Sequence, residues 1–377
     1  MKTTTQIDYR FKLLYAIGMI IIVAGHMEHR GFSLAFELFP PYAFHLGLFV
    51  FASGYLYKEN STDNPGKYIL KKAKQLLLPL YLWNFFYAVV ITVLSYAGFS
   101  FGSPVTLKTL LISPLTDGHQ FGFNLSGWFI VPLFLVQVLN MLIRKLCDKL
   151  HIRINEVLYF LGSMALGIFG VYMASLDYNT GLWLSLVRVL YFVPFYSLGI
   201  LYKKVLEKHD NLPSIWYFAI VLGLQLAIIF LYKKAPVYTP SWCNNFTDGP
   251  ILPFIVGFLG IAFWFRVVRI LTPVLAKNKY VNLIANNTYS IMINHLFAFF
   301  LINSVFAFMT KDTQCFLDFD WNRYFSDVAL IYCPFQIEQT GILFLAAGII
   351  LPILAQTSIN FVWKKCKALF HKKANPV

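Results

Sequence analysis

The chain has 377 residues, of which 58% are hydrophobic and only 13% are charged, and its mean hydropathy is +0.63. A soluble protein of this size is usually roughly a quarter charged, so this composition excludes an ordinary soluble globular protein. The net charge of +14 comes with no basic run interleaved with aromatic residues, which argues against a nucleic-acid-binding protein.

Apolar runs of roughly 20 residues, the length that crosses a bilayer as a helix, predict an all-α polytopic membrane protein with about ten transmembrane helices. The predicted helices lie near residues 12–27, 43–57, 76–97, 127–143, 157–176, 182–202, 214–232, 251–268, 286–309 and 333–363. The second is short, and the last is long enough to tilt or to be broken by Pro352. We expect one transmembrane domain over residues 1–377, because no internal repeat or appended soluble domain is visible.

The distribution of basic residues predicts the orientation of the chain. With the N-terminus inside, most of the 31 Lys and Arg residues fall in segments on the cytoplasmic side. This asymmetry is the one that sets membrane topology, and it indicates an even number of spans with both termini in the cytoplasm. Lys233 and Lys234 are the main exception, since they fall outside.

Two histidines lie at the ends of neighbouring predicted helices. His26 closes the first apolar run directly after Gly25, and His45 opens the second. Imidazole is the side chain best suited to moving protons near neutral pH, and an ionisable group at the edge of a span is a functional candidate. The pair could face one another across a short outer turn, which predicts a site of proton transfer. The alternative is an interfacial histidine that only ends a helix.

Three further polar residues lie inside predicted spans. Arg188 falls within the sixth, where an arginine either snorkels outward or meets an anion in a cavity. Asn294 and His295 fall in the middle of the ninth, from which neither reaches the interface easily. Both are therefore candidates to line a polar cavity.

A basic run precedes the third predicted span. Lys71 and Lys74 are three residues apart, so they share a helix face and could bind phosphates. The simpler interpretation is a topology signal at a cytoplasmic helix start. The five cysteines show no metal-ligand spacing, and we expect no metal; Cys243 and Cys315, in predicted outer loops, could pair.

The motifs, taken in chain order, resemble the acyltransferase-3 membrane O-acyltransferases. They are Arg10-Phe11-Lys12 leading to VAGH at His26, then FHLGLFVFASGYLYK, KKAKQLLLPLYLW, GWFIVPLFLVQ, VPFYSLGILYKK and NNTYSIMINHLF. The blocks run from about residue 10 to residue 300. Within the family, the chain is most similar to the capsular polysaccharide O-acetyltransferase and fucose-4-O-acetylase-like branch, which also lacks an appended hydrolase-like domain.

The resemblance implies an enzyme of the bacterial cell membrane. Such an enzyme transfers an acyl group, usually acetyl, from cytoplasmic acyl-CoA to a sugar hydroxyl of an extracytoplasmic or lipid-linked glycan. The family's essential histidine matches His26, and the histidine before the FxxxSGY block matches His45. The basic pair before span three, usually two arginines, matches Lys71 and Lys74. The basic residue expected eleven positions before the first histidine is here Tyr15.

These matches predict a role for each candidate. His26 is the general base on the acceptor hydroxyl or a transient acyl carrier, and His45 or Glu28 orients it. The residues expected to hold the phosphates of acetyl-CoA, the acyl donor, are Lys71, Lys74, Arg10 and Lys12. The residues expected to line the cavity and stabilise the oxyanion are Arg188, Asn294 and His295.

Two other classes of function fit the composition. One is a transporter or flippase for a glycan or glycolipid, in which the same residues bind without making bonds; no repeat between the halves of the chain supports it. The other is a sensor or assembly partner in an envelope polysaccharide complex. Release of the CoA thiol would separate the enzyme from both.

Overall fold

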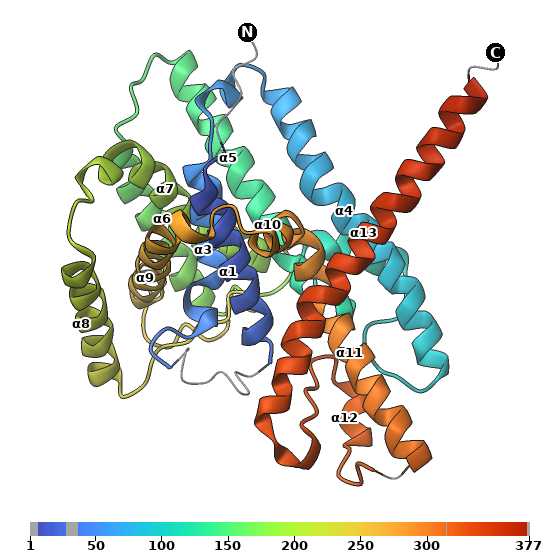
Figure 1. Ribbon diagram of the computed structural model, residues 1–377. Helices are drawn as coiled ribbons and strands as arrows, with labels where there is room; N and C mark the ends of the chain where they lie inside the picture. The colour runs from blue at the N-terminus through green and yellow to red at the C-terminus, as the bar shows by residue number, and fades with distance from the viewer. Residues whose placement is uncertain (1–6, 28–36, 314, 375–377) are drawn as a thin grey trace. The chain divides into compact units, whose positions relative to one another are not determined.

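The computed structural model describes residues 7–27, 37–313 and 315–374, which are almost entirely helical (Figure 1). Within these ranges there is no β-strand, and a single antiparallel bridge joins Gly102 to Phe121. The prediction of an all-α fold is therefore confirmed. The chain forms two compact units: a terminal unit of residues 1–31 with 274–377, and a central unit of residues 32–273.

Eight of the described helical segments are long and apolar enough to cross a membrane, which agrees with a polytopic membrane protein. They are Pro65–Tyr96, Gly122–Lys149, Glu156–Ser175, Gly181–His209, Ser214–Tyr232, Leu252–Leu275, Thr288–Thr313 and Glu338–Lys367. Helices α1 (Tyr9–Gly25) and α3 (Pro41–Tyr55) are apolar too, but with 17 and 15 residues they are shorter than the roughly 20 that span a bilayer. The total of ten spans, the cytoplasmic termini and the single domain stay predictions.

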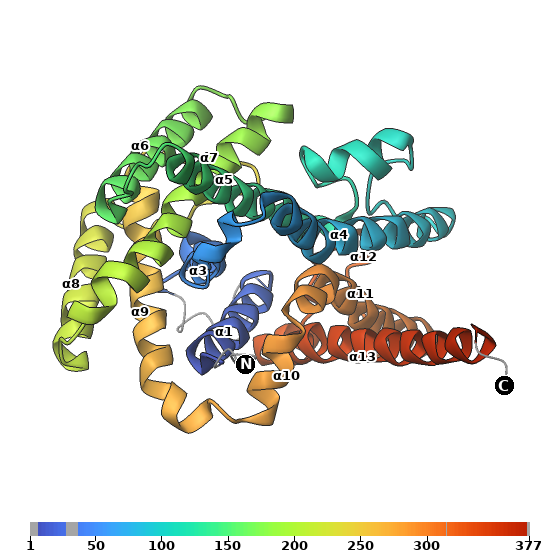
Figure 2. The same ribbon diagram turned by 90° about the horizontal axis from the view of Figure 1, so that it is seen from above.

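Five helices lie in the described part of the terminal unit. They are α1, α10 (Lys279–Asn286), α11 (Thr288–Thr313), α12 (Trp321–Ser326) and α13 (Gly341–Ala374). Helix α13 runs alongside α11, and α1 packs on α10, α11 and α13 (Figures 1 and 2). Gly348 of α13 permits this packing, because a Cβ atom there would lie 2.8 Å from Val23 in α1 and 2.9 Å from Phe299 in α11.

Helix α13 differs from the predicted last span at its start. The span was expected from residue 333, but α13 begins at Gly341, after the 3₁₀ turns η7 (Pro334–Gln336) and η8 (Glu338–Thr340). Phe335 and Gln336 have φ angles of 56° and 59°, a left-handed conformation that no α-helix can include. Pro352 does not break the helix, which continues through it to Ala374.

The described part of the central unit has seven α-helices. They are α3, α4 (Pro65–Tyr96), α5 (Ile130–Lys149), α6 (Glu156–Ser175), α7 (Gly181–Leu201), α8 (Ser214–Tyr232) and α9 (Leu252–Leu275). The short segments of this unit are η1 (Glu59–Thr62), η2 (Lys108–Ile112), η3 (Ser113–Leu115), η4 (Gly122–Phe129), η5 (Tyr202–Leu206) and η6 (Glu207–His209). Helix α7 packs against α3, α5 and α6 (Figure 2).

Two glycines bring α3 and α7 into backbone contact. A Cβ atom on Gly54 would lie 1.9 Å from the carbonyl oxygen of Tyr196, and one on Gly199 would lie 2.1 Å from that of Phe51. No side chain fits in either place, so both positions require glycine. Small residues that let helix backbones approach are the usual basis of helix association in membranes.

Helix α4 begins well before the predicted residue 76. Asn64 caps it by accepting a hydrogen bond from the backbone N–H of Lys67 at 2.9 Å, and Pro65 stands at the first helical position. Its 32 residues extend about 48 Å, more than the roughly 30 Å of bilayer hydrocarbon. A helix of this length exceeds the hydrocarbon at one or both ends, and its polar first turns, which carry Lys71 and Lys74, are the part expected to lie outside.

The cysteines test both the packing and the predicted topology. The structure holds all five as free thiols. Cys243 and Cys315 lie in different units, so the possibility that they pair stays a prediction. Cys243 is buried and its thiol donates to the carbonyl of Pro240 at 3.1 Å, while Cys315 is exposed. Burial raises the pKa of the Cys243 thiol to about 12.

We predict that a membrane-impermeant maleimide, applied to intact cells at about pH 8, labels Cys315 and leaves Cys243 unmodified. Only an accessible thiol with an appreciable thiolate fraction reacts. Mass spectrometry of the purified protein measures the modified sites, and Cys315→Ser is the control that should abolish labelling. Labelling of Cys147 or Cys366, both on the predicted cytoplasmic side, would contradict the topology.

Candidate active site

Two of the predicted histidines lie in direct contact within the terminal unit. His26 is the C-cap residue of α1, and His295 lies on α11. Their ring centroids are 4.7 Å apart with 60° between the ring planes. The structure therefore brings together two residues that are 269 positions apart in the chain, and it does so through the packing of α1 against α11.

The helix backbone determines which ring nitrogen of each histidine carries the proton. Nδ1 of His26 lies 2.9 Å from the carbonyl oxygen of Ile22, and Nδ1 of His295 lies 3.0 Å from that of Ile291. A carbonyl oxygen only accepts hydrogen bonds, so Nδ1 donates in both rings. The Nε2 atom of each neutral ring is then an unprotonated lone pair, the form that a base or nucleophile requires.

The Nε2 atom of His295 is buried and has no hydrogen-bond partner among the described residues. The residue is completely buried, with 0% exposure. A buried acceptor that lacks a donor carries a penalty of roughly 1–3 kcal/mol. A donor such as a hydroxyl group or water would remove this penalty.

Asn294 lies next to His295 and is held by its own helix. Its side-chain amide donates to the carbonyl of Ser290 at 2.9 Å, and the hydroxyl of Ser290 donates to the carbonyl of Pro352 in α13 at 2.8 Å. The second bond joins α11 to α13 between one and two turns from His295. The role of Asn294 in stabilising an oxyanion stays a prediction.

The two basic residues at the start of α1 already have partners. Arg10 forms an ion pair with Asp8 at 2.6 Å, and the ammonium group of Lys12 donates to the side chain of Asn286 on α10. Substitution by Arg10 or Lys12 for the basic residue expected at Tyr15 stays a prediction. Their assignment to cofactor phosphates also stays a prediction.

The other predicted catalytic residues do not belong to this pair. His45 is buried in the central unit, where its Nδ1 atom bonds to the carbonyl of Pro41 and its ring lies 5.3 Å from that of Tyr42. Its pairing with His26 stays a prediction, since the two belong to different units. Glu28 lies outside the described residues.

Arg188 connects two loops of the central unit. Its guanidinium donates to the carbonyls of Thr116 at 3.1 Å, Asp117 at 3.0 Å and Ser241, the last through both Nε and Nη2, and it lies 4.6 Å from the ring of Trp128. The residue is 1% exposed, whereas a snorkelling arginine needs an exposed guanidinium. The bonds give Arg188 a structural role, and its role at an oxyanion stays a prediction.

His119 lies near Arg188 and was not singled out in the sequence. Its ring stacks on Trp242 with centroids 3.8 Å apart. Burial, and secondarily the charge of Arg188, lower the pKa of His119 to about 3, so the ring is neutral. A lone histidine in a polar loop gives no signal of this environment, which arises from contacts across two loops.

Lys71 and Lys74 are exposed on α4, and neither forms an ion pair within the described part of the chain. Lys74 borders an apolar hollow formed by α4 and η2, with Tyr81 and Leu111 among its lining residues. Both ammonium groups are accessible to a phosphate, as a cofactor-binding role requires. The same exposure is expected of a topology signal.

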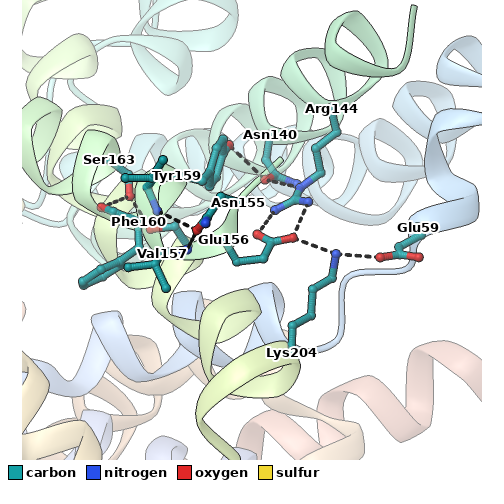
Figure 3. Close-up of polar contacts among 12 residues, drawn as sticks. Glu59, Asn140, Arg144, Asn155, Glu156, Val157, Tyr159, Phe160, Ser163 and Lys204 are labelled. Carbon is teal, nitrogen blue, oxygen red and sulfur yellow. Dashed lines mark hydrogen bonds and ion pairs between the residues drawn. The ribbon is translucent and has the colours of Figure 1, made fainter. Parts of the chain in front are cut away.

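A second group of charged residues, missed in the sequence, lies at the ends of α5, α6 and α7 (Figure 3). Arg144 of α5 forms a bidentate ion pair with Glu156 of α6, with distances of 2.9 and 2.7 Å. Lys204 bonds to Glu156 at 2.7 Å and to Glu59 at 2.6 Å. In the sequence these cations are indistinguishable from the positive-inside bias. Among the described residues, no group of His, Cys, Asp or Glu could hold a metal ion.

Residues 8–356 match the family model of the acyltransferase-3 domain, described as an acyltransferase domain. The match covers nearly the whole chain, including both units and every helix that holds a candidate residue. The comparisons with curated proteins and with solved structures each find no match.

We predict that Arg188→Lys lowers the free energy of unfolding in detergent by about 1–3 kcal/mol, because an ammonium group cannot bond to all three carbonyls at once. Arg188→Leu should be worse, since it leaves every carbonyl without a donor. Thermal or denaturant unfolding measures the effect. The control is Lys108→Leu, an exposed cation on η2, which should change stability by less than about 0.5 kcal/mol. Wild-type stability in Arg188→Leu would contradict the structural role.

Proposed function

This chain belongs to the acyltransferase-3 family and is a membrane acyltransferase, and from that premise we propose that it transfers an acetyl group from acetyl-CoA to a sugar hydroxyl. The proposed acceptor is an extracytoplasmic or lipid-linked glycan such as capsular polysaccharide, and the proposed location is the bacterial cell membrane. The observation that supports transfer to a hydroxyl is the contact of His26 with His295, each with an unprotonated Nε2 in its neutral form.

In the proposed reaction, Nε2 of His26 takes the proton of the acceptor hydroxyl while the hydroxyl oxygen attacks the thioester carbonyl carbon. The tetrahedral intermediate then collapses, the C–S bond breaks, and the proton on His26 passes to the departing CoA sulfur. The bond from Nδ1 to Ile22 supports this role, because it keeps the basic nitrogen at Nε2 and holds the ring in one orientation.

Acyl transfer through His26 itself is equally balanced. Nε2 would attack the thioester carbonyl carbon, and the C–S bond would break to release the CoA thiolate. The acceptor hydroxyl oxygen would then attack the acetyl carbon, the C–N bond to the imidazole would break, and the hydroxyl proton would pass to the CoA thiolate. Both routes require the same nitrogen to be unprotonated. Detection of acetylated His26 in protein quenched without an acceptor would favour the second route.

His295 complements His26 in either route. Its unpartnered Nε2 can accept a hydrogen bond from the acceptor hydroxyl, which would orient it toward the reacting carbon. Two imidazolium rings 4.7 Å apart would repel one another, so the pair holds one proton more readily than two. We also propose that His45 or Glu28 orients the pair and that Arg188 and Asn294 stabilise the oxyanion.

The donor phosphates are proposed to bind to the basic residues of the predicted cytoplasmic face. Lys71 and Lys74 are exposed there, at a point where α4 extends beyond the hydrocarbon. Lys12 and Arg10, which also bond to Asn286 and Asp8, are proposed to contribute further N–H donors. A transporter of the same glycan would bind the acceptor but would release no CoA thiol, and this distinguishes the two functions.

We predict that His26→Ala lowers the rate of CoA thiol release by about two to four orders of magnitude, the usual contribution of a general base. Purified protein with acetyl-CoA and acceptor glycan, followed with a thiol reagent, measures it. Expression and thermal stability should stay near wild type. The matched control is His209→Ala, which removes an exposed histidine from η6 and should retain activity. Near-normal turnover by well-folded His26→Ala would reject the assignment.

We predict that Lys71→Ala/Lys74→Ala raises the apparent KM for acetyl-CoA more than it lowers kcat, because it removes contacts to the donor and not to the reacting atoms. Added salt should enlarge the defect by screening the remaining phosphate contacts. The control is Lys145→Ala/Lys149→Ala, which removes two exposed lysines from the predicted cytoplasmic end of α5. An equal change of KM in both double variants would support a general charge effect.

A further inference from the structure

The central unit contains a cavity of about 680 Å³ at the ends of α5, α6 and the η5 turn. This volume lies within the range of small-molecule binding sites, roughly 300–1,000 Å³. All of its lining segments belong to the predicted cytoplasmic face. The lining residues that carry the argument are Tyr57, Glu59, Arg144, Arg153, Glu156 and Lys204.

One side of the cavity is formed by a rigid ion-pair network (Figure 3). The side chains of Arg144 and Glu156 are 7% and 10% exposed, and they form two parallel bonds. Arg144 also bonds to Asn140 at 3.2 Å and lies 5.0 Å from the ring of Tyr159. Charged groups held this firmly are already desolvated and oriented before a ligand arrives.

The network leaves several hydrogen-bond donors unused, although the carboxylate of Asp148 also lines the cavity. Each terminal nitrogen of Arg144 keeps one N–H that its bond to Glu156 does not use, and Lys204 keeps a third N–H. The hydroxyl of Tyr57 is buried without a partner in the described part of the chain, and burial raises its pKa to about 12, so it keeps its proton. Arg153 adds an exposed guanidinium. A ligand rich in acceptor oxygens satisfies such a site.

The two carboxylates bound to Lys204 differ in accessibility. The side chain of Glu156 is 10% exposed, whereas that of Glu59 is 76% exposed. An exposed ion pair contributes little to stability, so an incoming anion can displace Glu59 at low cost. The proximity of Lys204, and its hydrogen bond, lower the pKa of Glu59, which is therefore charged at neutral pH and competes with such an anion.

We propose that this cavity binds a phosphate ester, with Arg144, Arg153, Lys204 and the Tyr57 hydroxyl as donors and Glu59 as the counter-ion that it displaces. A phosphate monoester presents three acceptor oxygens and a charge near −2, and a phosphodiester headgroup presents fewer oxygens and less charge; either suits several donors converging from different helices. The ester is either the nucleotide part of the acyl donor or a phospholipid headgroup. In the first case the inference rests on the proposed function and gives the donor a binding site apart from Lys71 and Lys74.

The test is equilibrium binding to the full chain in nanodiscs of zwitterionic lipid, with unacylated CoA as the first probe. The second arm adds phosphatidylglycerol to the disc and measures its enrichment around the protein. Arg153→Ala should weaken binding of one probe by about tenfold or more, the effect of losing a hydrogen bond to a charged group. Lys149→Ala removes a cation from the same segment but not from the cavity, and it should change binding by less than about twofold.

Glu59→Gln should strengthen probe binding, whereas Arg153→Ala should weaken it. Glu59→Gln removes the competitor for Lys204, so binding should become several-fold tighter, whereas a purely structural ion pair would give no such gain. The inference is overturned if neither probe binds or if Arg153→Ala and Lys149→Ala weaken probe binding equally. It is also overturned if Glu59→Gln weakens probe binding, or if only the double variant Lys71→Ala/Lys74→Ala abolishes probe binding. Because CoA carries no acetyl group, binding is measured apart from turnover. Thiol release without CoA binding in this cavity would reject the cavity as a binding site and leave the proposed acyltransferase activity standing. CoA binding in the cavity without thiol release would support the cavity and reject the proposed activity.

Discussion

The rest of the structure depends on one constraint: a polar group inside a membrane must find its partner within the protein, because no water is available. The backbone satisfies this rule by forming helices, and the buried ionisable side chains satisfy it by bonding to the backbone. His26 and His295 each donate to the carbonyl four residues earlier, and Arg188 donates to three loop carbonyls. The same bonds leave the Nε2 atom of each neutral histidine ring unprotonated.

Helix packing provides the second requirement of the site, which is a close approach of α1, α11 and α13. Apolar side chains gain little by leaving lipid for one another, so association depends on surfaces that fit closely. Gly348 supplies such a surface, because α13 can approach Val23 and Phe299 only where it has no side chain. A Cβ atom at that position would also lie 3.5 Å from His295, so the packing contact and the imidazole pair share one location. Gly54 and Gly199 serve the same purpose between α3 and α7.

The basic residues of the predicted cytoplasmic face divide into two kinds once their surroundings are known. Lys71 and Lys74 are exposed on a helix that extends beyond the hydrocarbon, where charge costs little. Arg144 and Lys204 are instead held by carboxylates, and Arg144 is almost completely buried. Burying a charge without a partner is costly, so the carboxylates around Arg144 and Lys204 indicate that the fold holds these two cations in place. The Lys and Arg residues that predict the orientation of the chain thus include hydrogen-bond donors that line the cavity.

The sequence by itself determined the all-α membrane fold, most helix positions and the candidacy of His26 and His295, because hydropathy and the cost of a buried imidazole are local properties. It misplaced the start of α4, since lysines are good helix formers that a hydropathy window ignores, and the start of α13, since the left-handed Phe335 and Gln336 are not visible in a pattern. The contact between the two histidines, the loop carbonyls around Arg188 and the pairing of Arg144 with Glu156 were decided by the tertiary structure alone. Each joins residues through the packing of helices or loops, and no local pattern encodes which surfaces will meet.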